Sequence, residues 1–89
     1  MAKTVISKEK PDLSAPVNME ILGKYVRYKR TSIGMTLEDA ASLCSLSKQA
    51  YNNVEKGSGN IRVQTLFAVL NSLGIKLNIL DKEQESAWY

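Results

Sequence analysis

The stretch TLEDAASLCSLSKQAYNNVEKG, residues 36–57, determines how the rest of the chain is interpreted. Two hydroxyl residues in it, Thr36 and Ser47, each precede a run of helix-forming residues. A side-chain oxygen at such a position accepts a hydrogen bond from a free amide of the first turn and so caps a helix. The stretch therefore predicts two short helices, one from Thr36 to Leu43 or Cys44 and one over Lys48–Lys56, joined by a tight turn.

Two short helices joined by a turn of three or four residues are the arrangement of the helix-turn-helix motif. The motif needs a small residue where its helices cross, and Ala41 occupies that place. It needs an apolar residue in the turn, which is Leu46. It also needs apolar residues on the inner face of the second helix, where Tyr51 and Val54 are three positions apart and share a face.

The segment from Leu22 to Ile75 resembles the XRE family of helix-turn-helix domains, the class of phage repressors and many antitoxins. The matching positions are Gly23, Val26, Arg27, Arg30, Gly34, Thr36, Ala41, Leu46, Ser47, Glu55, Gly57, Thr65, Leu66, Leu73, Gly74 and Ile75. Leu37 stands where the family usually has a glutamine that contacts phosphate, and Tyr51 where a branched aliphatic is usual. Ser45 replaces the usual turn glycine, so it must tolerate a strained backbone or a shifted turn.

Apolar spacing predicts a helix on each side of the motif. One runs over Asn18–Thr31, with Asn18 as its candidate cap and one buried apolar stripe. The other runs over Val63–Leu73, is the most apolar element, and stops at Gly74. The predicted fold is therefore mainly α, a four- to five-helix, phage-repressor-like helix-turn-helix domain over residues 17–75.

The residues that follow this domain alternate between apolar and polar with a period of two, which is typical of a strand. An isolated strand cannot satisfy its own backbone, and the chain offers no second convincing strand. We therefore predict that residues 76–80 form a dimerisation strand that pairs with the same strand of a second copy. Its apolar residues, counted from the end of the domain, are Ile75, Leu77 and Ile79. An irregular extension lying on the preceding helix is the alternative.

Both ends of the chain are predicted to be polar extensions. Residues 1–16 contain two prolines among lysines and serines and predict a flexible N-terminal arm. Residues 81–89 form an acidic tail that ends in Trp88 and Tyr89. These aromatic residues cannot easily reach the core of their own domain, so we interpret them as a partner-binding tail, with a dangling end as the alternative.

The outer face of the helix over residues 48–56 is predicted to enter the major groove of DNA. Removing its buried positions leaves four candidate base contacts: Lys48, Gln49, Asn52 and Asn53. Amide side chains bond adenine through N6 and N7, and lysine reaches the acceptors of guanine. The candidate phosphate contacts lie at helix N-termini and in or beside the loop after this helix: Thr36, Ser47, Lys56, Asn60 and Arg62. The resemblance also implies a structural salt bridge between Arg27 and Glu55. An ordinary polar helix face is the alternative for the base contacts.

Composition argues against an enzyme. The chain has 89 residues, a net charge of +3, no histidine and a single cysteine. The usual zinc sites and the commonest general base are therefore missing, and no P-loop or GxGxxG pattern occurs. We expect no catalytic residue, metal or cofactor. No apolar run is long enough to span a membrane and no signal peptide is visible, so we expect a bacterial cytoplasmic protein, associated with the nucleoid when bound to its operator.

Within the XRE family, the length, the strand placed directly after the last helix and the acidic tail resemble the HipB-type antitoxins of HipA-type kinase toxins. This resemblance implies a homodimer that represses its own operon by binding double-stranded operator DNA. It also implies a HipA-like kinase toxin as a partner, held partly through Trp88. A stand-alone phage-type or chromosomal regulator without a toxin partner is one alternative. A protein-interaction module with little DNA binding is the other.

Overall fold

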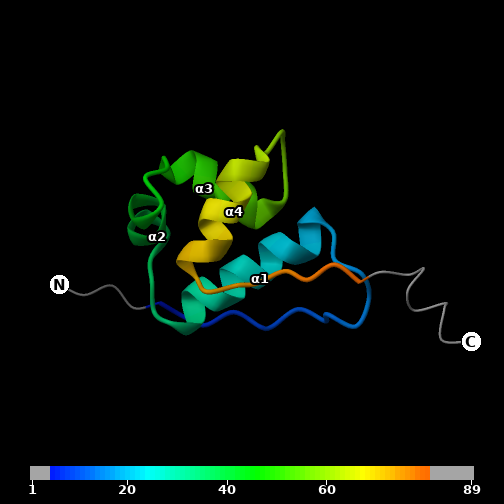
Figure 1. Ribbon diagram of the computed structural model, residues 1–89. Coiled ribbons are helices and arrows are strands. Elements are labelled where there is room, and N and C mark those ends of the chain that lie inside the picture. The colour runs from blue at the N-terminus through cyan, green and yellow to red at the C-terminus, as the bar shows by residue number, and fades with distance from the viewer. Residues whose placement is uncertain (1–4, 81–89) are drawn as a thin grey trace, which may run out of the picture.

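The computed structural model describes residues 5–80. Within them the chain forms four helices: α1 (Met19–Ser32), α2 (Leu37–Leu43), α3 (Lys48–Lys56) and α4 (Val63–Ser72). Figure 1 shows α1 running beneath the other helices, with the N-terminal segment and the segment after α4 both extending along it. The predicted mainly α fold is confirmed, and each predicted helix agrees with the structure to about one residue at either end.

Side-chain caps set where the first three helices begin. Asn18 Oδ1 accepts a hydrogen bond from the Ile21 amide at 2.8 Å. Thr36 Oγ1 accepts one from the amide of Asp39 at 3.1 Å, and Ser47 Oγ accepts one from the amide of Ala50 at 3.0 Å. Each bond satisfies one of the amides that have no partner inside the helix. The three caps predicted from the sequence are therefore confirmed.

All four helices contribute to the core, where Val26, Tyr51, Val54 and Val69 have no exposed surface and Ala41 of α2 is buried beside them. The crossing of α1 and α3 depends on Gly23. A Cβ atom at this position would lie 2.5 Å from the carbonyl oxygens of both Val54 and Glu55, closer than real Cβ atoms approach. The two helices can approach this closely because Gly23 has no side chain.

A buried ion pair joins the same two helices. Arg30 Nε donates to Glu55 Oε2 at 2.5 Å, and Arg30 Nη2 donates to Glu55 Oε1 at 3.1 Å. The predicted partner, Arg27, is therefore wrong. Arg30 follows Val26 by one helical turn and shares its buried face, whereas Arg27 is rotated by about 100° from Val26 and is exposed.

The turn between α2 and α3 contains the strained residue that the sequence indicated. Ser45 has φ 57°, and within residues 5–80 it is the one residue other than glycine with a positive φ. Two hydrogen bonds hold the turn, from the Ser45 amide to the Ser42 carbonyl at 3.0 Å and from the Leu46 amide to the Ala41 carbonyl at 2.9 Å. The turn keeps its register, and Ser45 adopts the left-handed conformation.

The segments outside the helices form no strand within residues 5–80. Ile75 is buried, whereas Leu77 is 43% exposed and Ile79 is 98% exposed. The pairing of residues 76–80 with a second copy stays a prediction, because one protomer offers no partner strand. The flexible arm over residues 1–16 also stays a prediction, although the Lys8 amide donates to Thr31 Oγ1 at 2.9 Å. Trp88, Tyr89 and the rest of the predicted tail lie outside the described residues.

Replacing Ser45 with glycine is expected to stabilise the protein by about 0.5–1 kcal/mol, because glycine adopts a left-handed backbone without the steric cost of a Cβ atom. Urea unfolding followed by circular dichroism measures this change. Ser42→Gly is the matched control, since Ser42 lies inside α2. That variant should lose about 0.5 kcal/mol, because glycine is less favourable than serine inside a helix. Equal effects of the two substitutions would contradict the role of backbone strain.

Removing one member of the buried ion pair, as in Glu55→Leu, is expected to lower the free energy of unfolding by about 3–5 kcal/mol, because it leaves the Arg30 guanidinium buried without its carboxylate. Replacing both members, in Arg30→Met with Glu55→Leu, should cost less than the sum of the single changes. The exposed pair of Lys24 and Glu20, whose side chains are 61% and 71% exposed, serves as the control. Glu20→Ala should cost at most about 1 kcal/mol. Additive effects of the Arg30 and Glu55 changes would contradict this account.

Candidate nucleic-acid interface

Helix α3 presents a polar face to solvent because its other face is fixed in the core. Its buried residues are Tyr51, Val54 and Glu55. The four residues predicted to contact bases share the opposite side of the helix, since their spacing of i, i+1, i+4 and i+5 defines one face. They are Lys48, Gln49, Asn52 and Asn53, of which the first two are exposed and the last two partly exposed.

Two side-chain interactions organise this face. Gln49 Nε2 donates to Asn53 Oδ1 at 3.2 Å, which aligns the two amides one turn apart along the helix. Lys48 Nζ lies 3.4 Å from Glu38 Oε1 on α2, and both side chains are more than half exposed. An exposed pair of this kind contributes little stability, so the Lys48 ammonium is free to exchange its partner. The amide groups and the ammonium are the types of group that read base edges in the major groove.

The residues predicted to contact phosphate fall into two groups. Thr36 and Ser47 use their hydroxyl oxygens as helix caps. The first turn of α2 carries two acidic residues and that of α3 carries none, so an anion is better accommodated beside Ser47 than beside Thr36. The second group lies at the end of α3 and in the loop that leads to α4, and its members are exposed: Lys56, Asn60 and Arg62.

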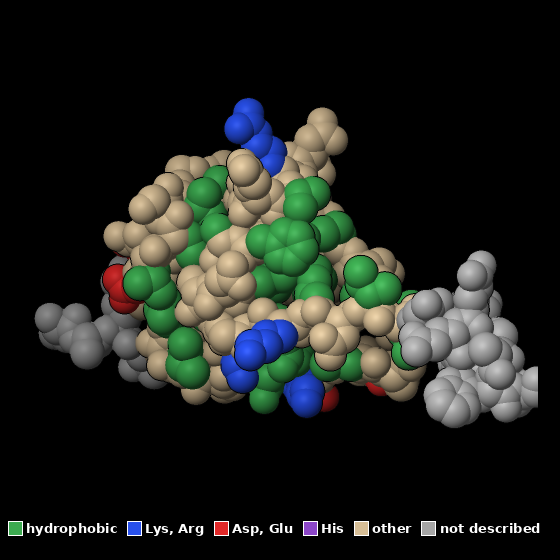
Figure 2. Space-filling model, in the orientation of Figure 1, with side chains coloured by type: hydrophobic (Ala, Val, Ile, Leu, Met, Phe, Trp, Pro, Cys, Tyr) green, Lys and Arg blue, Asp and Glu red, His purple; other side chains and the backbone are tan. Residues whose placement is uncertain are grey.

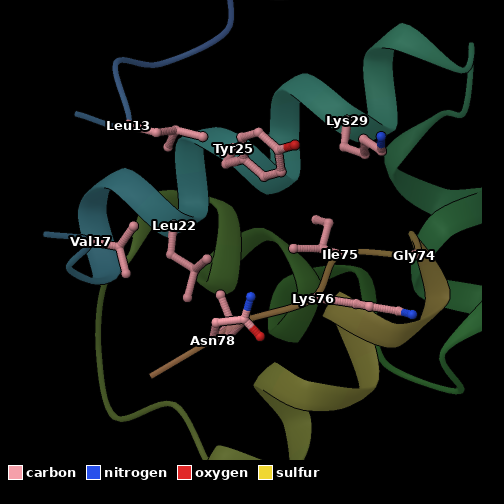
Figure 3. A pocket seen from close by; sticks show the side chains of 10 residues that line it. Leu13, Val17, Leu22, Tyr25, Lys29, Gly74, Ile75, Lys76 and Asn78 are labelled. Carbon is pink, nitrogen blue, oxygen red and sulfur yellow. The ribbon is translucent and has the colours of Figure 1, made fainter. Parts of the chain in front are cut away.

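A second surface feature is a groove along α1, on the side where the N-terminal segment and the segment after α4 lie. The groove, of about 310 Å³, lies between the N-terminal segment, α1 and residues 74–78. Figure 3 shows the side chains that line it. Leu13 and Val17 form one wall, and Leu22 and Tyr25 of α1 lie between that wall and Ile75. The lining is mainly apolar and includes two lysines, Lys29 and Lys76, so this groove is suited to an apolar chain segment.

Two other kinds of functional feature are absent from the part of the chain that the structure describes. None of the helices over residues 5–80 is both long and apolar enough to cross a membrane. In the same range, no cluster of three or more histidine, cysteine, aspartate or glutamate residues is arranged to hold a metal ion.

Comparison with known proteins agrees with the fold. The family model described as "Helix-turn-helix" matches residues 26–80, and no curated protein matches the sequence. Among solved structures, the chain is similar to one described as "MDT Protein" and to a chain of a HipA-HipB-O2-O3 complex. Each has a TM-score of 0.68 and 20% identity, over 79% of this chain and 99% of the other. A complex of a HipB variant with an O2 20mer gives the same TM-score and identity over 80% and 99%.

The family match spans more than half of the chain and includes both helices of the motif and the turn between them. The expected resemblance to XRE-type domains is confirmed by this match and by the shared fold. The chain belongs to the helix-turn-helix family.

Proposed function

We propose that this protein is a sequence-specific DNA-binding transcriptional repressor that acts as a homodimer. The observation that carries the proposal is the polar face of α3. Its four base-reading candidates share one side of a helix whose other side is held by the core and by the Arg30–Glu55 pair. A rigid helix presents amide and ammonium groups in fixed register, which direct readout of base pairs requires.

In the proposed complex, α3 lies in the major groove and its amide groups bond adenine. Ser47 and the loop with Asn60 and Arg62 bind the flanking phosphates, which position the protein without reading sequence. A dimer places one such helix in each half-site of a palindromic operator, with half-sites about 34–36 Å or a multiple apart. Repression follows when this operator overlaps a promoter.

Replacing Gln49 and Asn53 together with alanine is expected to remove the preference for operator DNA, because each bidentate bond to a base contributes about 1–3 kcal/mol of discrimination. Fluorescence anisotropy with DNA from upstream of the gene, against scrambled DNA of equal length, measures that preference. Gln64→Ala, an exposed amide on α4, is the matched control and should leave it unchanged. If the double variant still prefers the upstream DNA, α3 is not the helix that reads it.

The homodimer is proposed to form through residues 75–80. Their backbone makes no strand pairing within the described part of the chain, and the apolar side chains of Leu77, Ile79 and Leu80 are exposed. Helix α4 adds further exposed apolar side chains, with Val63 65% and Phe67 46% exposed. Figure 2 shows apolar side chains gathered over α4. Strand pairing with a second copy satisfies the backbone and covers this surface.

Ile79→Asp is expected to shift the protein from dimer to monomer while leaving the fold of the protomer unchanged, because Ile79 is 98% exposed in one protomer. Analytical ultracentrifugation over a range of concentrations measures the shift. Ile6→Asp makes the same chemical change at a position that is 74% exposed in the N-terminal segment, and it should leave the dimer intact. A dimer of equal strength in both variants would argue against the strand interface.

The partner proposed for this dimer is a HipA-like kinase toxin, in which case the chain is the antitoxin and autoregulator of a toxin–antitoxin operon. Support comes from the similarity of its fold to a chain of a HipA-HipB-O2-O3 complex and from the resemblance of its sequence to HipB-type antitoxins. Co-purification with a kinase encoded beside its gene tests this partner. A chain that represses its own promoter but captures no such kinase would be a stand-alone regulator.

A further inference from the structure

A hollow of about 550 Å³ lies between α1 and α3, next to the face of α3 that carries the base-reading candidates. Its lining includes Asn52 and Lys56 from α3 and Leu37 at the start of α2. From α1 come Lys24, Arg27 and Arg30. Asn52 lines the hollow and also belongs to the polar face of α3 that carries the base-reading candidates. If α3 lies in the major groove of a DNA duplex, one of the phosphate strands that border the groove therefore passes close to the hollow.

Some of the charged side chains around the hollow have an ion-pair partner and others do not. Arg30 is committed to Glu55 in the buried pair. Lys24 Nζ lies 3.4 Å from Glu20 Oε1, so the second carboxylate of the hollow is also matched. Arg27 is exposed, and its side chain makes no hydrogen bond or ion pair with other residues in the range 5–80. Within this hollow, whose two acids are both matched, Arg27 and Lys56 remain as surplus positive charge. Arg27 also borders a second hollow, against the N-terminal segment, whose lining holds two acids, Glu9 and Asp12, together with Lys8 and Lys10; Arg27 forms no ion pair with either acid within residues 5–80.

The same hollow contains Leu37 at the start of α2, whose aliphatic side chain cannot donate a hydrogen bond to a phosphate. We propose that Arg27 binds a DNA phosphodiester at this hollow and supplies the donor there. An arginine is suited to the task, because its planar guanidinium donates to two phosphate oxygens at once.

The position of Arg27 relative to α3 is fixed by its neighbours on α1. Arg30, three residues later, is held by Glu55 of α3, and Gly23, four residues earlier, lies against the α3 backbone. The guanidinium of Arg27 therefore emerges from a rigid part of α1 and not from a mobile loop. This inference rests on the proposed DNA-binding function and adds a phosphate-binding residue to it.

The test compares the salt dependence of operator binding for the wild type, Arg27→Gln, Arg27→Lys and Lys29→Gln, by anisotropy with upstream and scrambled DNA. Lys29→Gln is the matched control, since this cation also belongs to α1 but lines the groove beside residues 74–78. Arg27→Gln should reduce the slope of log K against log salt by about 0.9 for each phosphate that the variant no longer neutralises, or about 1.8 for a dimer. Affinity at 0.1 M salt should fall roughly tenfold for each such phosphate.

The preference for upstream over scrambled DNA should stay unchanged in Arg27→Gln, since bonds to phosphate carry no sequence information. Arg27→Lys should restore most of the slope, and Lys29→Gln should keep it. A slope for Arg27→Gln equal to that of Lys29→Gln overturns the inference while leaving the proposed function intact. A wild-type protein that binds neither DNA overturns the proposed function, and the inference with it.

Discussion

The close crossing of α1 and α3 is the constraint on which the rest of the structure depends. It is possible because Gly23 leaves room for the α3 backbone, and it is held by the buried pair of Arg30 and Glu55. Taking two charges out of water is costly, and their attraction offsets this cost only when both partners are present and well oriented. We infer that the pair favours one relative position of the two helices, and so the direction in which the polar face of α3 points.

The core around α3 contains a group whose burial lowers the stability of the folded protein. Tyr51 has no exposed surface, and its hydroxyl has no hydrogen-bond partner among the residues that the structure describes. Burial, with a smaller contribution from Glu55, raises the pKa of this hydroxyl well above its usual value. An unsatisfied buried hydroxyl costs about 1–3 kcal/mol. Burial of the aromatic ring offsets that cost, since the ring fills the space between α3 and its neighbours.

Local signals explain what could be predicted from the sequence. Caps such as Asn18 and Ser47 act within one turn of their own helix, so they marked the helix starts to within a residue. The choice between Arg27 and Arg30 was harder, because both match the family pattern and a difference of three residues is less than one turn. The sequence does carry a signal: Val26 belongs to the predicted apolar stripe of α1, and Arg30, one turn later, is the arginine that shares its buried face. The hollow that contains Arg27 and Leu37 is lined by residues of three helices that lie far apart in the sequence. No local sequence pattern therefore predicts it.

The extended segment after α4 shows a second reason why the sequence predicts only part of the structure. Its alternating pattern is that of a strand, and a strand requires a partner that one copy of the chain does not supply. Ile75 packs against the core, and the residues beyond it become progressively more exposed, from Leu77 to Ile79. The segment is therefore anchored at its start and unpaired further on. If two copies pair there, the symmetry axis of the dimer lies beside this segment. Because Ile75 packs in the core, the axis then has a fixed position relative to the core and therefore to α3. The spacing of two recognition helices would then follow from the same interactions that fold each protomer.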